Sequence, residues 1–254
     1  MKVASWNINS LRKRQDRLFG WLEATKPDVV CLLETKCPDD QFPALALQAA
    51  GYHSAYHGEK SYNGVAILAK TELREIRPSL CDEVADPQAR VIAATIGQLR
   101  VFSIYAPNGQ VVGSPTYEYK LQWYRRLRDC VPKEKSVDVI VCGDFNVAPE
   151  DIDVYNAELW RGAIMASNGE RAAFRELCTL GLRDTLRIHH KESDLFSWWD
   201  YQMRGFEKNR GLRIDAVLAS ESLAKNCVAS GIDREMRGGK DPSDHAPVWA
   251  EFED

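Results

Sequence analysis

Residues able to bind a metal ion or a phosphate follow several apolar stretches of the sequence. Glu34 ends VVCLLETK, and Asp144 and Asn146 end VIVCGDFN. A single acid at such a place is usually a helix cap or a turn former, so each residue alone is weak evidence. Asp215 interrupts the apolar run of LRIDAVL, where an ionised carboxylate is costly unless a metal or a hydrogen-bond donor compensates it. The set also includes Asn7, Tyr105, Asn108, Asp244 and His245.

The donor types in this set predict magnesium-assisted hydrolysis of a phosphate ester. Magnesium prefers one or two carboxylates and several retained waters, which matches Glu34 with help from Asn7 or Asp244. Zinc would favour several His or Cys ligands, and calcium a denser carboxylate loop, and we find neither pattern in the sequence. We therefore expect Mg²⁺, with Mn²⁺ as a substitute. His245, in PSDHAPVW, is the natural compensator of Asp215.

Alternating strand and helix patterns predict the elements that position these residues. Helices are expected from Ser10, as N-cap, to Pro27, over 115–131, and around 170–181, where Gly181 closes the helix. The order favours two sheets packed face to face with helices outside, although a doubly wound single sheet has a similar pattern. Strand ends on one side of such a fold converge on a crevice. The predicted strands are 2–8, 28–33, 64–69, 90–96, 99–105, 137–143, 213–220 and 246–252.

The composition is that of a globular protein, with 254 residues, 44% hydrophobic and 28% charged. No linker, low-complexity tract or repeat divides the chain, so we expect one domain, 1–254. The apolar stretches are too short to span a membrane and no signal peptide is visible, which favours a cytoplasmic protein. Seven cysteines without a CxxC pair suit neither a disulfide framework nor a zinc site.

The formal net charge of −4 gives no global attraction to nucleic acid, so such a partner would need a local basic surface. The segment YQMRGFEKNRGLR contains four basic residues against one acid, immediately before Asp215. A charge run is more often a solvated face. Its position beside the candidate site, together with the basic residues 12–14, favours contact with DNA phosphates. The four basic residues are Arg204, Lys208, Arg210 and Arg213.

Seven short blocks of the chain resemble, in order, the signature blocks of the exonuclease III family of DNA repair nucleases. They are SWNINSLR, LLETK, YNGVAIL, YAPNG, GDFNVAP, SWWDYQMRGFEKNRGLRIDAVLAS and PSDHAPVW. The resemblance implies a four-layered α/β sandwich within the endonuclease/exonuclease/phosphatase superfamily. It also implies cleavage 5′ to abasic sites, with 3′-5′ exonuclease and 3′-phosphatase or phosphodiesterase activity. The expected partner is duplex DNA with abasic sites, nicks or blocked 3′ ends, and the expected state is a monomer.

The same resemblance implies a role for each candidate residue. Glu34 would bind the metal with Asn7 and Asp244 nearby, and Tyr105 would stabilise the phosphate or the leaving oxygen. Asp144 would hold or deprotonate the attacking water, which Asn146 would orient, and His245, paired with Asp215, would contact the phosphate. Trp198, Leu212 and Ile214 resemble the family's apolar pocket for a base-free sugar. The full predicted DNA-binding set is Asn63, Asn108, Trp198, Arg210, Leu212, Arg213 and Ile214.

Two other functions stay open at this level. One is a phosphoesterase of the same superfamily that acts on a non-DNA substrate such as an inositol phosphate; the RGLRID block and Trp198 favour DNA instead. The other is a non-catalytic DNA-binding relative, against which the intact acids and His245 argue. The sequence also leaves open which activity dominates, whether one or two metal ions take part, and which group is the general base.

Overall fold

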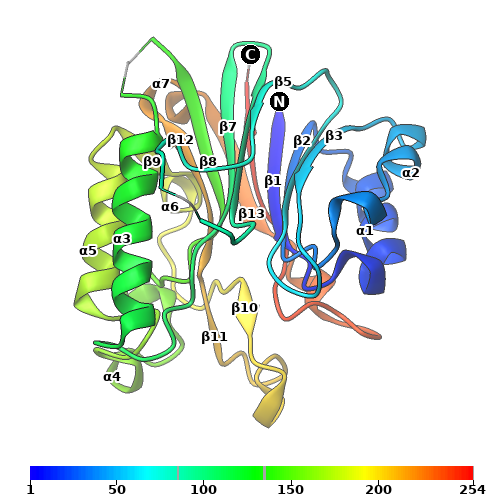
Figure 1. Ribbon diagram of the computed structural model, residues 1–254. Coiled ribbons are helices and arrows are strands. Elements are labelled where there is room, and N and C mark those ends of the chain that lie inside the picture. Colours follow the sequence, from blue (N-terminus) through cyan, green and yellow to red (C-terminus); the bar gives the residue numbers. More distant parts are fainter. Residues whose placement is uncertain (85, 134–135, 254) are drawn as a thin grey trace.

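Two six-stranded mixed β-sheets form the centre of the molecule (Figure 1). The computed structural model describes residues 1–84, 86–133 and 136–253. The first sheet has the order β13-β14-β1-β2-β4-β3, and the second has the order β5-β6-β7-β8-β12-β9. The first sheet contains β1 (Lys2–Asn7), β2 (Val29–Leu33), β3 (His53–His57), β4 (Val65–Ala69), β13 (Cys227–Ile232) and β14 (Val248–Phe252). The second contains β5 (Arg74–Arg77), β6 (Val91–Ile96), β7 (Leu99–Tyr105), β8 (Asp138–Asp144), β9 (Leu182–Asp184) and β12 (Asp215–Ser220).

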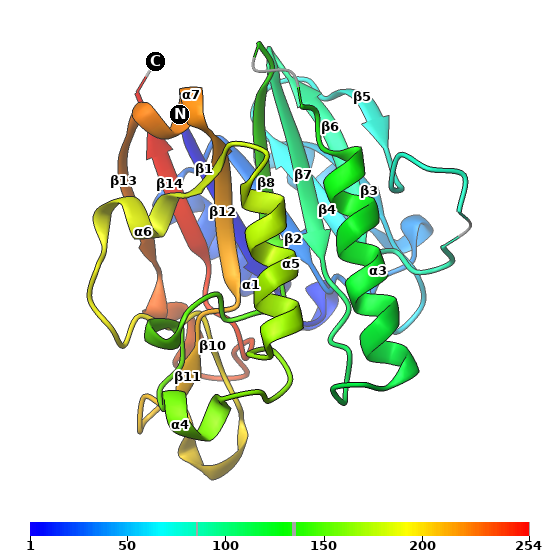
Figure 2. The ribbon, with the colours of Figure 1, turned by 90° about the vertical axis from the view of Figure 1, so that its left-hand side faces the viewer.

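The sheets pack face to face and helices cover their outer faces. Val3 and Cys31 of one sheet share a buried apolar cluster with Val101 and Cys142 of the other. Figure 2 shows α3 (Pro115–Cys130) and α5 (Asn168–Cys178) across the second sheet. On the first sheet, α1 (Leu11–Thr25) and α2 (Ala44–Ala49) pack against a separate apolar cluster. The predicted four-layered α/β sandwich is confirmed, and the single-sheet alternative is wrong.

Short elements complete the connections. The hairpin of β10 (Trp198–Trp199) and β11 (Gly211–Leu212) lies below the sheets in Figure 1, at the edge opposite the two termini. No helix in the described part of the chain is long and apolar enough to cross a membrane. The remaining helices are α4 (Ala157–Trp160), α6 (Thr185–His189) and α7 (Glu221–Lys225), with 3-10 turns η1 (Asp39–Gln41), η2 (Asp151–Asp153), η3 (Gln202–Arg204) and η4 (Arg234–Arg237).

Two helix starts show how the chain enters the site region. Pro115 occupies the first turn of α3, and the Ser114 side chain accepts a hydrogen bond from the Tyr117 N–H, as expected of an N-cap. α1 also begins where predicted, but the Ser10 side chain makes no cap bond, so that part of the prediction is wrong. Ser10 instead donates its backbone N–H to the Glu34 carbonyl at 2.7 Å, which ties the start of α1 to the end of β2.

The strand register brings the candidate residues to one edge. β1 and β2 run parallel and end together, and so do β7 and β8. β12 is antiparallel to β8, so Asp215 at its start lies opposite Asp144, which in turn lies beside Tyr105. β14 is antiparallel to β1, and His245 precedes it at the same edge. Residues paired directly across a sheet have side chains on the same face.

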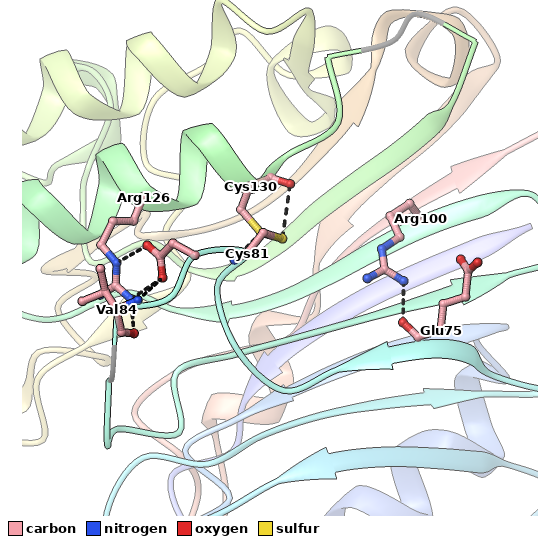
Figure 3. The surroundings of a disulfide bond; sticks show 7 residues. Glu75, Cys81, Val84, Arg100, Arg126 and Cys130 are labelled. Atoms are coloured by element: carbon pink, nitrogen blue, oxygen red, sulfur yellow. Dashed lines mark hydrogen bonds and ion pairs between the residues drawn. A yellow bond between two sulfur atoms is a disulfide. The ribbon is translucent and has the colours of Figure 1, made fainter.

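A disulfide joins Cys81 to Cys130, the last residue of α3 (Figure 3). The expectation that the cysteines suit no disulfide framework missed this pair, while the other five cysteines are free. The signal was weak in sequence because the two cysteines lie 49 residues apart. Arg126, one turn earlier on α3, donates to the Asp82 carboxylate at 2.6 Å and to the Val84 carbonyl at 3.2 Å, so the segment is held at a second point.

Alkylation of the denatured protein, after exposure to oxidant and without reduction, is expected to label five thiols, and all seven should label after reduction. Because a cross-link restricts the unfolded chain, Cys81→Ser should lower the free energy of unfolding by about 2–4 kcal/mol in denaturant titrations. Cys178→Ser, which replaces a free and half-buried thiol, is the matched control. Seven labelled thiols before reduction, or equal unfolding free energies for the two variants, would contradict the disulfide.

Candidate active site

A buried histidine between two carboxylates is the centre of the site. His245 Nδ1 lies 2.8 Å from Asp215 Oδ2, and His245 Nε2 lies 3.7 Å from Asp144 Oδ2. All three side chains are almost fully enclosed. Ser197 Oγ accepts the backbone N–H groups of Ile214 and Asp215, which fixes the start of β12 beneath the histidine. The predicted pairing of His245 with Asp215 is present.

The electrostatics of this group favour a charged imidazolium. Burial disfavours the charge, but the carboxylates of Asp215 and Asp144 outweigh it and raise the pKa of His245 to about 10. Asp215 Oδ1 accepts no hydrogen bond from the described residues, so the histidine is the main compensation for this buried carboxylate. Burial, assisted by the charges of Asp215 and Glu34, raises the pKa of Asp144 to about 7 against the opposing effect of His245.

Glu34, at the end of β2, reaches the same centre from the first sheet. The Asn7 amide donates to Glu34 Oε1 at 2.8 Å and to Asp144 Oδ2 at 3.0 Å, so one side chain joins the ends of β2 and β8. Lys36 Nζ lies 2.8 Å from Glu34 Oε2. Glu34 has a φ of 49°, which turns the chain sharply at the end of β2. These contacts leave the Glu34 carboxylate only partly exposed, at the rim of the site.

Asp244 lies to one side of this centre. Its Oδ1 accepts from Asn9 Nδ2 at 2.8 Å, and its Oδ2 accepts from Trp198 Nε1 at 3.0 Å. Burial raises the pKa of Asp244, but the charge of His245 and these two hydrogen bonds more than offset it and lower the pKa below its usual value. Asn9 Oδ1 accepts from Lys36 Nζ at 2.7 Å, so Asp244 connects to Glu34 through Asn9 and Lys36.

The donor set fits a divalent cation. Carboxylate oxygens of Glu34 and Asp144 lie within 4.8 Å of each other and of a ring nitrogen of His245. Because the charged imidazolium offers no lone pair, the two carboxylates are the candidate metal ligands of this group. The four carboxylates of Glu34, Asp144, Asp215 and Asp244 face the cations His245 and Lys36, an excess of about two negative charges when all four are ionised. Oxygen donors dominate, as magnesium and manganese prefer. Of the two carboxylates predicted to bind the metal, Glu34 belongs to this group and Asp244 does not.

The loop after β8 turns Asn146 into the site. Gly143 has a φ of 153°, and a Cβ there would lie 1.9 Å from the Ile104 carbonyl, so only glycine fits. The alternation of an extended chain would send Asp144 and Asn146 to one side. Asn146 instead has a φ of 50°, and this turn places both polar groups at the site. Asn146 donates its N–H to Asp144 Oδ1 at 2.8 Å. Asn108 Nδ2 donates to Asn146 Oδ1 at 3.2 Å.

Tyr105 closes the row on the second sheet. The Arg90 guanidinium lies over its ring, 4.8 Å from the centroid, and donates to the Tyr105 carbonyl at 3.3 Å. Burial, with the charges of Glu34 and Asp144, raises the pKa of Tyr105 well above its ordinary value. The hydroxyl therefore keeps its proton at neutral pH and is a hydrogen-bond donor toward the site.

The predicted apolar pocket residues do lie together. Leu212 and Ile214 are buried in one cluster, and the half-buried Trp198 packs against it. Trp199 is fully buried, because neighbouring residues of a strand face opposite ways. Asn63 approaches from the loop between β3 and β4, where its carbonyl accepts the Lys36 N–H at 2.9 Å.

Two predicted phosphate contacts are wrong because the side chains point inward. Arg213 is 1% exposed; its Nε lies 2.6 Å from Asp153 Oδ1 and its Nη1 lies 2.7 Å from Asp184 Oδ2. Against the effect of burial, these carboxylates raise the pKa of Arg213. Arg14 is also buried and donates to backbone carbonyls, including that of Pro242 at 2.8 Å. Arg210 is exposed and stays available to a ligand.

Three residues of the site region were missed from the sequence: Asn9, Lys36 and Arg90. Asn9 and Lys36 each lie two positions after a predicted ligand, in SWNINS and LETK, so the two-residue repeat of an extended chain was a usable signal. Arg90 had no such signal, because it reaches Tyr105 only through the pairing of β6 with β7.

The sequence profile of the Endonuclease/Exonuclease/phosphatase family matches residues 4–245. The chain belongs to this family. Exodeoxyribonuclease III of Haemophilus influenzae is 39% identical over 99% of this chain and 100% of that protein. An exodeoxyribonuclease of Bacillus subtilis is 34% identical over 98% of each chain. These family members match the whole length of the region that contains the site.

Solved structures of family members share the fold closely. A 3′ phosphatase of Neisseria, NExo, bound to a product DNA hairpin, superposes with a TM-score of 0.97 at 41% identity, covering 100% of this chain and 99% of that one. An AP endonuclease from Archaeoglobus fulgidus superposes with a TM-score of 0.96 at 35% identity, covering 100% of each chain. This chain, the Neisseria 3′ phosphatase and the Archaeoglobus AP endonuclease therefore share the two-sheet architecture.

Proposed function

We propose that this protein is a magnesium-dependent DNA repair phosphodiesterase of the exonuclease III type. It would hydrolyse the phosphodiester 5′ to abasic sites and act as a 3′-5′ exonuclease and 3′-phosphatase or phosphodiesterase on duplex DNA. The observation that carries the proposal is the enclosed His245–Asp215 pair beside Asp144 and Glu34, at an edge where both sheets end. The named activities of the family members described above support the choice of DNA as substrate.

The proposed roles follow from charge and hydrogen-bonding capacity. His245, cationic through Asp215, would stabilise the negative charge that grows on the phosphate. Asp144 would hold the attacking water and accept its proton, since a pKa of about 7 lets this carboxyl exchange a proton near neutral pH. Asn146 would orient that water. Tyr105 would donate a hydrogen bond from its hydroxyl to a phosphate or leaving oxygen and so stabilise it.

Glu34 and Asn7 would hold the metal ion, with Asp244 as an auxiliary ligand on the far side of Asn9. A bound divalent cation would polarise a phosphate oxygen and reduce its charge. The side chains of this protein would hold the ligands in place. Asn7 bonds to both Glu34 and Asp144 and keeps them at a set distance, and Lys36 orients Glu34 through Oε2. Mg²⁺ is the proposed ion and Mn²⁺ a substitute.

The proposed DNA contacts lie on the loops around this edge. The exposed Arg210 would contact phosphates, with Asn63 and Asn108 at the rim. Trp198 would form the accessible wall of a sugar pocket backed by Leu212 and Ile214. The proposed substrates are duplexes with abasic sites, nicks or blocked 3′ ends, bound by a monomer whose residues 1–254 form one catalytic domain.

We also propose a cytoplasmic location, which has a consequence for the disulfide. Reducing compartments keep most protein thiols reduced. Cys81 and Cys130 would be a dithiol there and would form the disulfide on exposure to oxidant.

Initial rates on four matched substrates test the proposed function. We expect magnesium-dependent cleavage of an abasic duplex, with turnover also on a recessed 3′ end and a 3′-phosphate, and none on an inositol phosphate. Excess EDTA should stop all cleavage, and added Mg²⁺ should restore it. Turnover of the inositol phosphate alone would assign the other superfamily branch, and DNA binding without any cleavage would assign the non-catalytic relative.

A further inference from the structure

A buried ion pair lies directly behind the two asparagines of the site. Lys120 on α3 and Glu170 on α5 are both fully enclosed, with Lys120 Nζ 2.5 Å from Glu170 Oε1. Burial lowers the pKa of Lys120, and the charge of Glu170 opposes this shift. A buried ion pair is weak evidence for a stabilising role, because removing two charges from water costs as much as their attraction returns. Its other contacts therefore matter.

The Lys120 ammonium joins the two loops that carry the asparagines. Besides Glu170, it donates to the Asn108 carbonyl at 3.0 Å and to the Asn146 carbonyl at 2.7 Å. These three acceptors match the three donors of a lysine. On the other side of the same backbone, Asn108 Nδ2 donates to Asn146 Oδ1. Asn146 Nδ2 also donates to the Ala106 carbonyl at 2.9 Å. The loops after β7 and β8 are thus joined by Lys120 through their backbone carbonyls and by the Asn146 amide within the site.

A second side chain of α3 supports the same loop. Tyr124, four residues after Lys120 and on the same helix face, donates its hydroxyl to the Phe145 carbonyl at 2.5 Å. Lys120 and Tyr124 therefore bind consecutive carbonyls. Asn146 has a left-handed φ of 50°, a conformation that persists only when surrounding contacts impose it. Two donors from one rigid helix provide that constraint.

Glu170 is itself held at every oxygen. Oε1 accepts the Met165 N–H at 3.0 Å, and Oε2 accepts the Ser167 N–H at 3.1 Å and the Ser167 hydroxyl at 2.6 Å. Glu170 and Ser167 form the capping box of α5. The carboxylate therefore has one orientation, and it fixes the Lys120 ammonium in turn.

We propose that Lys120, with Glu170 as its counter-ion, is a positioning residue for the Asn108–Asn146 pair. It acts through the backbone carbonyls and holds the Asn146 amide in place beside Asp144. This inference rests on the proposed function, since it assigns Asn146 to the reacting side of the site. A pair with a merely structural role would affect stability and leave turnover by the folded protein unchanged.

The test compares two double variants that remove an α3–α5 ion pair. Lys120→Met with Glu170→Gln removes the buried pair without leaving an unpaired charge. Arg128→Met with Glu176→Gln removes the exposed pair of the same two helices, whose atoms lie 3.0 Å apart. We expect the first to lower kcat on an abasic duplex about 10- to 100-fold with KM changed less than about threefold, because a small displacement of an aligning group acts on the reacting geometry. The second should stay within about twofold.

An NMR readout separates this inference from the proposed function. In metal-free protein without DNA, the side-chain amide resonances of Asn108 and Asn146 should shift in the Lys120 variant and stay in place in the Arg128 control. If they shift while the wild type cleaves no DNA, the proposed function fails and the positioning role stands. Unshifted resonances, or an unchanged kcat with a lower melting temperature, overturn the positioning role.

A single variant covers the case in which the double variant does not fold. Tyr124→Phe removes only the hydroxyl that binds the Phe145 carbonyl. We expect the same direction of effect, a loss in kcat of about three- to tenfold and a shift of the Asn146 amide resonance. Unchanged values of both overturn the proposal that α3 positions this loop.

Discussion

Asp144→Asn is expected to lower kcat on an abasic duplex by about 10⁴-fold, with little change in KM, because the amide cannot accept a proton from the attacking water. The Asn146 N–H and the Asn7 amide donate to different oxygens of Asp144. The single amide oxygen of the variant can keep the Asn146 bond, and Asn7 keeps its bond to Glu34, so the fold should survive. The measurement is single-turnover cleavage with enzyme in excess over DNA.

The pH dependence of the same step gives a second readout. Burial raises the pKa of Asp144 to about 7. In the wild type at limiting Mg²⁺, kcat should therefore rise as the pH increases through about 7. The variant should lack this limb. Asp138→Asn, at the opposite end of the same strand β8, is the matched control and should keep both rate and pH profile. A full rate for Asp144→Asn would assign the base elsewhere.

Asp215→Asn is expected to lower the pKa of His245 from about 10 toward its ordinary value and to cut kcat by about 10²–10³-fold. The reason is that Asp215 is the nearest counter-charge, at 2.8 Å, and without it burial disfavours the imidazolium. At neutral pH a part of the enzyme would then carry an uncharged histidine facing the phosphate. Titration of the His245 ring by NMR, in metal-free wild type and metal-free Asp215→Asn, measures the change in pKa directly.

The free energy of unfolding should also depend on the ionisation of His245. A histidine whose folded-state pKa is raised contributes stability that is fully present below about pH 6.5 and is lost as the pH rises through about 10. The free energy of unfolding of the wild type should therefore contain a decline in that window, which Asp215→Asn should lack. Asp144, whose pKa is also raised, gives a separate decline between about pH 3.8 and 7. Equal His245 pKa values in the two proteins would mean that Asp215 is not its partner.

Much of the fold was predictable because its central strands are locally distinctive. The apolar runs of β1, β2, β4, β6, β7, β8, β12 and β14 are each interrupted by few polar residues, and each prediction matched a strand. Edge strands gave no such pattern. β5 (REIR) is exposed along its length, and β13 (CVASGI) contains a glycine and is fully buried at only two of its six positions, so both were missed. Short edge strands form because a neighbour pairs with them, which local sequence does not record.

Local sequence was least informative for charged residues. Arg210 and Arg213 look equivalent in the run KNRGLRID, yet one is exposed and the other is enclosed by Asp153 and Asp184. The difference arises because β11 and β12 turn Arg213 toward carboxylates that come from distant segments. The Cys81–Cys130 disulfide and the Lys120 contacts depend in the same way on where α3 packs.

The sequence by itself determined the residue types of the site and their places at strand ends, since the acids, amides and His245 stand out against apolar runs and within family motifs. Tertiary structure decided which of them meet: β12 pairs antiparallel with β8 and sets Asp215 opposite Asp144, and His245 enters from the other sheet. It also decided the charge states, with a raised pKa for both His245 and Asp144. The physical reason is that pairing, burial and Coulomb interactions act between segments far apart in the chain, whereas the sequence pattern reports only near neighbours.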